Sequence, residues 1–193
     1  DLKGTRCVEG YDFVNDRSEA ADDHGHGTHV AGTIAQTTDN GHGVAGLAHC
    51  ARLMPIKVLN AGGYGTVADV AAGIRFAADH GAQVINMSLG GRIKSDILQA
   101  AVEHAQKKGV IVVAAAGNTR KSVEWPAAYP GVVAVSATDS KGQLAWFSSR
   151  GPEVAIAAPG VDVVQQTVCN HGHDKCEVFG KFSGTSMASP HVA

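Results

Sequence analysis

Large aromatic side chains are scarce in this sequence, and its apolar runs are short. Only 5% of the 193 residues are Phe, Trp or Tyr, although 44% are hydrophobic and 24 are glycine. This composition predicts an interior of small and β-branched side chains in which backbone segments approach closely. No run of about 18 apolar residues occurs, so the sequence predicts no membrane-spanning segment and no membrane partner.

An excess of charge of one sign is also missing. The 16 Lys and Arg residues nearly balance the 18 Asp and Glu residues, which gives a formal net charge of −2 with histidine neutral. The basic residues form no cluster or stripe, so we expect no nucleic-acid partner. No linker, repeat or low-complexity segment divides the chain. We therefore expect residues 1–193 to form a single domain, and we expect a monomer.

Cysteine occurs only at Cys7, Cys50, Cys169 and Cys176. The last two lie in the polar stretch VCNHGHDKCEV, whose interleaved histidines leave both a loop disulfide and a zinc site open. We favour a Cys169–Cys176 disulfide, because zinc ligands ordinarily follow a shorter and more regular spacing. Cys7 and Cys50 could form a second bridge. Two bridges would indicate an oxidising compartment.

Short β-branched runs alternate along the chain with helical patterns. The pattern predicts helices at 66–81 and 95–109, and strands at 53–59, 83–91, 110–118 and 131–139. Continuous apolar strands separated by amphipathic helices indicate an α/β fold with a parallel sheet covered on both faces. Functional residues of such sheets lie at the carboxyl ends of the strands. This rule directs attention to residues 88–91 and 114–118.

Three histidines, His24, His26 and His29, lie close together in DDHGHGTHVAGT. Their H-x-H-x-x-H spacing resembles the metal-binding motif of the metallo-β-lactamase superfamily, which suggests a zinc hydrolase. The match is incomplete, because that superfamily has Asp immediately before the last histidine, where this chain has Thr28. The alternative is a histidine that packs against or caps a helix.

Two further segments carry candidate catalytic groups. Asn118 ends AAAGN, where a strand terminus and a preceding glycine can direct its amide toward a substrate oxygen; the alternative is an ordinary turn residue. Ser186 lies in GTSMASPHVA, and Pro190 is tolerated there if a helix begins near Ser186. Free N–H groups at a helix start favour nearby negative charge. The alternative is that Ser186 is only an N-cap.

Taken together, four segments in this order resemble the subtilisin-like serine proteases, the subtilases: GHGTHVAGT, SLGG, AAAGN and GTSMASPHVA. The likeness covers essentially the whole chain. It implies a three-layer αβα subtilisin-like fold with a mostly parallel central sheet, truncated at both ends. It also implies a secreted serine endopeptidase that hydrolyses peptide or protein substrates through an acyl-enzyme intermediate, without an organic cofactor. The resemblance assigns His26 as the base, Ser186 as the nucleophile and Asn118 as an oxyanion-hole donor.

The resemblance also implies substrate-binding residues. Those that flank an extended peptide are Gly63, Tyr64, Gly65, Ser88, Leu89 and Gly90; those that line the primary side-chain pocket are Ala115, Ala116 and Gly117. Small side chains on these walls leave room for a large apolar P1 side chain. No acidic residue stands in these segments, so a strict preference for Lys or Arg is not expected. The glycines at 62–65 could alternatively form a plain turn.

A structural calcium site is a further implication of the resemblance. Asp1 matches a side-chain ligand of many subtilases, and the loop TTDNGHGV resembles their calcium-binding loop. The ligands would be the Asn40 side chain and the carbonyl groups of Thr38, His42 and Val44. Oxygen ligands of this kind suit Ca²⁺. The alternative is an ordinary polar loop.

The chain departs from the subtilase pattern in one important respect. No Asp-Thr-Gly or Asp-Ser-Gly motif precedes His26, so we expect the strand with the catalytic Asp upstream of Asp1. The helix after Ser186 is expected to be cut at Ala193, without the C-terminal helices. The polypeptide alone is therefore expected to be weakly active or inactive.

Two other functions compete with the protease. One is a catalytically inactive subtilase homologue that binds peptides, and the other is a zinc hydrolase that uses His24, His26 and His29. Asp22 and Asp23 do not carry the catalytic motif, and we expect them in a solvated loop.

Overall fold

The computed structural model describes residues 2–168 and 179–193. Within these residues, no helix has both the length and the apolar character that crossing a membrane requires. The backbone divides into two compact units, one of Asp1–Gly73 with Val164–Lys181 and the other of Ile74–Val163 with Phe182–Ala193. Each unit is described by itself, and the single domain over residues 1–193 stays a prediction.

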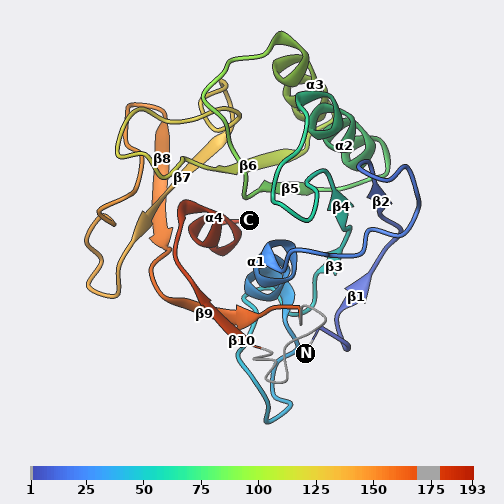
Figure 1. Ribbon diagram of the computed structural model, residues 1–193, viewed down its shortest axis with the longest axis vertical. Coiled ribbons are helices and arrows are strands. Elements are labelled where there is room, and N and C mark those ends of the chain that lie inside the picture. Colours follow the sequence, from blue (N-terminus) through green and yellow to red (C-terminus); the bar gives the residue numbers. More distant parts are fainter. Residues whose placement is uncertain (1, 169–178) are drawn as a thin grey trace. The chain divides into compact units, whose positions relative to one another are not determined.

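The second unit is built around a four-stranded parallel sheet (Figure 1). Its strands lie in sequence order and are β5 (Val84–Met87), β6 (Ile111–Ala115), β7 (Val133–Thr138) and β8 (Val154–Pro159). The sequence predicts the first three of these strands correctly. It does not predict β8, in which most residues are exposed and whose last residue is a proline.

Helices lie on both sides of this sheet. Figure 1 shows α3 (Asp96–Lys107) and α4 (Thr185–Ala188) on opposite sides of it. Small and β-branched side chains fill the core beneath α4, as the scarcity of aromatic residues predicts; they are Val113, Val135, Ala137, Ala145, Ala158 and Ala188. Short side chains allow a helix to lie close to a sheet. The expected α/β fold with a mostly parallel central sheet is confirmed.

The predicted helix boundaries agree with the structure. Ser95 caps α3 by accepting a hydrogen bond from the Leu98 N–H at 3.4 Å, and Gly109 follows the helix with φ of +81°. The helix predicted at 66–81 is α2 (Val67–Asp79). Its start is held by Thr66, whose hydroxyl accepts from the Asp69 N–H and donates to the Asp69 carboxylate.

The first unit contains α1 (His26–Ala35) and short strand pairs. The pairs are β1 (Arg6–Cys7) with β3 (Arg52–Leu53), and β2 (Tyr11–Asp12) with β4 (Ile56–Lys57); β9 (Val163–Gln166) pairs with β10 (Phe179–Phe182) at the boundary of the units. The prediction of one continuous strand at 53–59 is wrong. Pro55 separates β3 from β4, because a proline has no N–H to donate to a neighbouring strand.

Candidate active site

Ser186 is the second residue of α4, in the second unit. Its hydroxyl donates to the Ser88 carbonyl at 3.1 Å, and the Ser88 hydroxyl donates in return to the Ser186 carbonyl at 2.7 Å. In a continuous helix, residue 190 would donate to that Ser186 carbonyl, but Pro190 has no N–H. The predicted helix start near Ser186 is confirmed, because α4 begins at Thr185. α4 ends at Ala188, and Pro190 lies in the 3₁₀ turn η1 (Ser189–His191).

A hydrogen-bonded network connects β5 to the nucleophile segment. Asn86 donates from Nδ2 to the Ser88 hydroxyl at 3.0 Å, and its Oδ1 accepts from the Ser189 hydroxyl. Ser88 is therefore held by Asn86 on one side and by Ser186 on the other. Asn86 and Ser189 are not among the site residues that the sequence predicts. The signal that could have identified Asn86 is its polar side chain within the otherwise apolar strand VINM.

Asn118 follows β6 and is exposed. Its Oδ1 accepts from the Thr185 N–H at 2.9 Å and from the Thr185 hydroxyl at 3.1 Å, and the Thr185 hydroxyl in turn accepts from the Gly117 N–H. These donors assign the amide orientation, which leaves Nδ2 on the side of Gly184. A Cβ atom on Gly184 would lie 3.6 Å from Nδ2. The amide nitrogen of Asn118 can therefore donate to a group at the start of α4.

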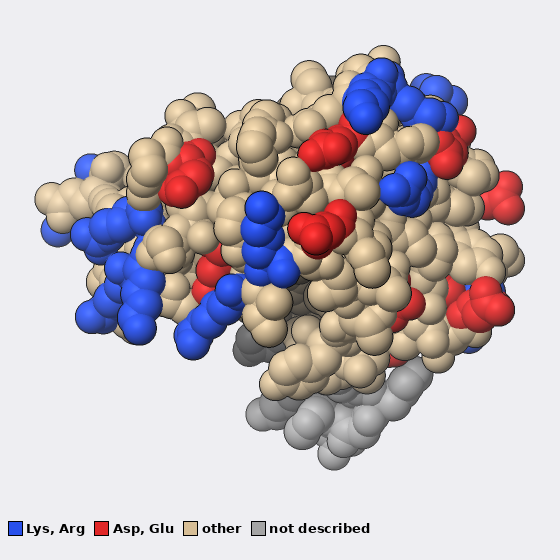
Figure 2. Space-filling model, turned by 90° about the horizontal axis from the view of Figure 1, so that it is seen from above, with Lys and Arg blue, Asp and Glu red and all other residues tan. Residues whose placement is uncertain are grey.

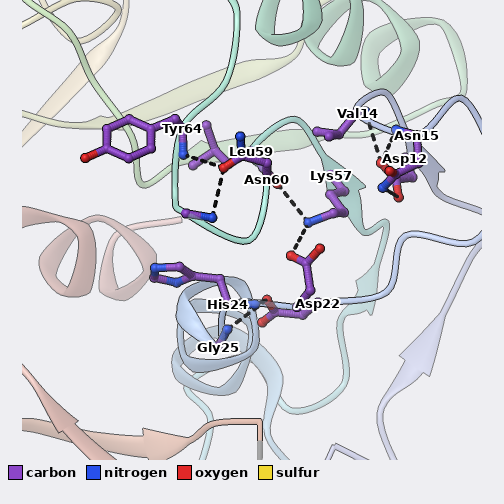
Figure 3. A network of polar contacts seen from close by, with 12 residues as sticks. Asp12, Val14, Asn15, Asp22, His24, Gly25, Lys57, Leu59, Asn60 and Tyr64 are labelled. Atoms are coloured by element: carbon purple, nitrogen blue, oxygen red, sulfur yellow. Dashed lines mark hydrogen bonds and ion pairs between the residues drawn. The ribbon is translucent and has the colours of Figure 1, made fainter. Parts of the chain in front are cut away.

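His26 is the first residue of α1, in the first unit. The helix start is held by Asp22, which accepts through Oδ1 from the His24 and Gly25 N–H groups at 2.9 Å each (Figure 3). Its Oδ2 accepts from the Thr28 N–H at 2.8 Å and from the Thr28 hydroxyl at 2.6 Å. The expectation of a solvated loop is wrong for Asp22, because this half-buried carboxylate organises the turn before the helix.

The ionisation of Asp22 follows from these contacts. Burial alone would raise the pKa of Asp22, but the hydrogen bonds from Thr28, Gly25 and His24 outweigh it and hold the pKa below its ordinary value. The neighbouring Asp23 is half exposed and forms an ion pair with Lys57. Asp22 is therefore ionised at neutral pH, with both oxygens occupied.

The His26 imidazole is neutral near pH 7. Burial is the main cause that lowers its pKa below the ordinary value. Charge on His24 lowers the pKa further, and the negative charge of Asp22 raises it by less than the other two lower it. A neutral imidazole can accept a proton, as a general base must. His26 and the pair Ser186 with Asn118 lie in different units.

The three histidines of the first unit occupy different environments. His29 is fully buried in α1, where its Nε2 lies 3.1 Å from the Gly180 carbonyl oxygen. His24 is exposed, with its ring 6.3 Å from that of His26 between centroids. Across the residues described, no group of three His, Cys, Asp or Glu side chains could hold a metal ion. A zinc site formed by His24, His26 and His29 is therefore not favoured.

The loop with Gly63, Tyr64 and Gly65 is a tight turn organised by Asn60. The Asn60 side chain accepts from the Gly62 and Tyr64 N–H groups at 2.9 and 3.2 Å, and the Tyr64 ring is 77% exposed (Figure 3). Gly63 has φ of +76°, a conformation that favours glycine. The turn interpretation is thus correct for the backbone, and the turn presents an aromatic ring to solvent.

The remaining predicted substrate-binding residues belong to the second unit. Ser88, Leu89 and Gly90 follow β5, and the segment 115–117 lies at the end of β6, where all three residues are buried. The sequence analysis places no acidic residue in these segments. The structure places the Glu124 side chain against both of them, a neighbour that no local sequence signal identifies.

The predicted calcium loop is partly ordered by the protein itself. The Asn40 side-chain oxygen accepts from the His42 N–H at 3.0 Å, and the buried Gln36 donates to the Val44 carbonyl at 2.7 Å. The Thr38 hydroxyl is buried without a hydrogen-bond partner among the described atoms. Carbonyl and amide oxygens retain a second lone pair when they accept one hydrogen bond, so this donor set fits a hard cation. The remaining predicted ligand, Asp1, lies outside the described residues.

The cysteine predictions have two outcomes. Cys7 and Cys50 are both exposed free thiols, so the suggested bridge between them is wrong. Cys169 and Cys176 lie outside the described residues, and the disulfide between them stays a prediction. The described cysteines therefore provide no evidence for an oxidising compartment.

Comparisons with known proteins show the family of this chain. The sequence profile of the subtilase family matches residues 3–193. The chain is 45% identical over 194 residues to the thermophilic serine proteinase of Bacillus sp. strain AK1, and 43% identical over 194 residues to thermitase of Thermoactinomyces vulgaris. Each alignment covers 100% of this chain, which spans 46% of the first relative's length and 67% of the second's.

Solved structures of subtilisin-like proteases also resemble this chain. The crystal structure of a cold adapted subtilisin-like serine proteinase superposes with a TM-score of 0.86 and 37% identity, covering 97% of this chain and 65% of that one. A protease structure from Pseudoalteromonas arctica PAMC 21717 superposes with a TM-score of 0.90 and 33% identity, covering 97% and 70%. This chain belongs to the subtilase family.

Proposed function

We propose that the protein carrying this chain is a serine endopeptidase that works through an acyl-enzyme intermediate. His26 takes the proton of the Ser186 hydroxyl as its oxygen attacks the peptide carbonyl carbon. The resulting oxyanion accepts hydrogen bonds from the Asn118 Nδ2 and from the Ser186 N–H. His26 then gives its proton to the leaving amine, and water hydrolyses the acyl group from Ser186.

The observation that carries this proposal is the orientation of Asn118. Its Oδ1 accepts two hydrogen bonds from Thr185, so its Nδ2 remains the donor for a group at Ser186. As the second residue of a helix, Ser186 has an N–H that donates to no carbonyl within the helix. Two donors therefore lie near one nucleophile, as stabilisation of an oxyanion requires.

Asp22 does not serve as the carboxylate that orients the His26 ring. Both of its oxygens accept hydrogen bonds, from three backbone N–H groups and the Thr28 hydroxyl. Its contribution to His26 is electrostatic, because its negative charge favours the imidazolium that forms during the reaction. Activity is therefore best measured on the full-length protein that carries this chain.

For substrates, we propose broad specificity with a preference for large apolar P1 side chains. The residues Ala115, Ala116 and Gly117 have small or no side chains, which leaves space beside the predicted scissile bond. An extended peptide would lie along residues 63–65 and 88–90. We also propose that the protein is a secreted monomer, which cell fractionation and sedimentation can test.

We propose a structural calcium ion at the loop 38–44. The Asn40 side chain and the carbonyl oxygens of Thr38, His42 and Val44 would hold it, together with Asp1. The ion would stabilise the loop and take no part in the reaction. Chelation should therefore lower the melting temperature, and an unchanged melting temperature would count against the site.

Serine-directed labelling tests the main proposal. A fluorophosphonate should form an adduct on Ser186, and the protein should hydrolyse an unfolded protein substrate. Ser186→Ala should abolish the adduct and lower kcat by about 10⁶-fold, the size of loss known for subtilisin without its serine. A folded protein that binds peptides without labelling would instead be an inactive homologue. Stoichiometric zinc in metal analysis would favour the zinc hydrolase.

A further inference from the structure

Glu124 lies against both walls of the predicted P1 site. A Cβ atom built on Gly117 would lie 2.7 Å from the Glu124 Cδ and 2.9 Å from its Oε2. A Cβ atom built on Gly90 would lie 3.4 Å from the same Oε2. One carboxylate oxygen therefore faces the ends of two neighbouring strands, β5 and β6. A side chain at position 117 would displace the Glu124 side chain from this place, and Gly117 also has φ of +107°.

The backbone holds Glu124 in this position. Its N–H donates to the Ala116 carbonyl at 2.9 Å, which attaches residue 124 to the wall formed by 115–117. The next residue, Trp125, exchanges two hydrogen bonds with Gly91 at 2.8 and 2.9 Å, which attaches it to the segment after β5. Hydrogen bonds to both segments thus fix the residue whose side chain lies between them.

The carboxylate has few partners in the protein. The Glu124 side chain is only 15% exposed, and no N–H or O–H of the described residues donates a hydrogen bond to its carboxylate. Among the described residues its ion-pair partner is Arg92, whose Nε lies 4.0 Å from Oε1 on a side chain that is 77% exposed. An exposed pair at this distance is weak. A largely buried carboxylate with so few hydrogen-bond and ion-pair partners in the protein favours the binding of a cationic ligand.

We propose that Glu124 is a specificity-determining residue that binds the cationic end of a P1 lysine or arginine side chain. This inference rests on the proposed protease function and adds a substrate class to it. The long aliphatic stem of either side chain would contact the small walls, as a large apolar side chain would. Its ammonium or guanidinium group would then form a charge-assisted hydrogen bond with the carboxylate. The absence of acidic residues from the wall segments themselves therefore does not exclude basic substrates.

Two peptides that differ only at P1 test this inference on the full-length protein. One carries lysine and the other norleucine, whose aliphatic side chains match except for the charged amino group of lysine. The ratio of kcat/KM for lysine over norleucine should fall about tenfold or more in Glu124→Gln, which keeps the shape and removes the charge. Glu103→Gln is the matched control, because Glu103 is an exposed acid on α3 whose partner is Gln99. That variant should retain the ratio of the unmodified protein.

The unmodified protein provides a second measurement that needs no variant. Added salt should lower kcat/KM for the lysine peptide more than for the norleucine peptide, since salt screens attraction between charges. An equal ratio in the unmodified protein and in Glu124→Gln would overturn the role of Glu124 while leaving the protease function intact. If neither peptide is cleaved and Ser186 is not labelled by fluorophosphonate, the proposed function fails, and this inference fails with it.

Discussion

Helices α1 and α4 carry the two proposed catalytic residues in their first turns, but these turns are built differently. The start of α1 is occupied by a carboxylate, since Asp22 accepts four hydrogen bonds there. The start of α4 follows Gly184, and the acceptor of its Thr185 N–H is the neutral amide oxygen of Asn118. A negative charge thus lies at the positive end of the helix beside His26, whereas a neutral group is bound at the helix start beside Ser186.

This difference suits the two proposed roles. A carboxylate beside His26 favours the protonated imidazole that forms when the base takes a proton. A carboxylate at the start of α4 would instead compete with the oxyanion for the N–H donors. The same helix geometry can therefore assist a base or an oxyanion, depending on which residue precedes the first turn.

Apart from loss of the Ser186 nucleophile itself, the largest expected effect comes from removing the donor beside α4. Asn118→Ala should lower kcat by about 10²–10³-fold with little change in KM, as for the corresponding asparagine of subtilisin. Thr185→Val is the informative companion, because it removes the hydroxyl that donates to Asn118 and keeps the Asn118 Nδ2. Steady-state kinetics should show a smaller loss of kcat for it. Equal kcat in Asn118→Ala and the unmodified protein would remove Asn118 from the mechanism.

The second prediction makes the start of α4 resemble that of α1. A Cβ atom on Gly184 would lie 3.6 Å from the Asn118 Nδ2 and 3.7 Å from the Ser186 N, so a side chain fits there. Gly184→Asp should lower kcat by roughly tenfold or more, since its charge would occupy the oxyanion donors. Gly184→Asn is the neutral control of equal shape and should lose less. Equal losses in both variants would show that shape, rather than charge, matters at this position.

The third prediction removes the carboxylate from α1. Asp22→Ala should lower the free energy of unfolding by about 0.5–2 kcal/mol, because the N–H groups of the first turn lose their acceptor. Since hydrogen bonds hold the folded pKa of Asp22 below its unfolded value, its stabilising effect is present above the unfolded pKa. That effect is lost as the pH falls through the folded pKa. Denaturant titrations at neutral and acidic pH should therefore converge for the two proteins as the pH decreases.

Asp79 provides the control for that experiment. This exposed carboxylate accepts hydrogen bonds from Lys108 and His104, which lower its pKa to about 2. Asp79→Asn should change the stability at neutral pH less than Asp22→Ala does, because solvent screens exposed pairs. A larger loss for Asp79→Asn would contradict the importance assigned to the turn before α1.

The smallest expected effect concerns the pH dependence of the base. Charge on His24 lowers the pKa of His26, so His24→Gln should raise that pKa. The acid limb of the kcat/KM profile should then move to higher pH, because His26 must be neutral to accept a proton. Activity should fall at pH 6 and stay unchanged at pH 8. An unmoved acid limb would show that charge on His24 does not set the His26 pKa.

Local periodicity predicted the elements that are long and apolar. The helices α2 and α3 and the strands β5, β6 and β7 follow from it, because their patterns repeat over several residues. It failed where context decides: Pro55 divides an apolar run into β3 and β4, and β8 pairs with β7 without a clear pattern of its own. The face in Figure 2 carries side chains of both signs, with Lys and Arg gathered toward its left end.

The sequence by itself determined the family of this protein and the chemistry of its candidate groups, because each motif is a short segment with its own residue types and spacing. Only the tertiary structure decided which groups share a site. Ser88 and Ser186 are 98 positions apart, and Asn118 and Thr185 are 67 apart. Glu124 likewise meets Gly90 and Gly117 only in the folded sheet. Parallel strands bring their carboxyl ends to one edge of the sheet. The spacing of residues within a short motif does not predict which side chains from different strands meet at that edge.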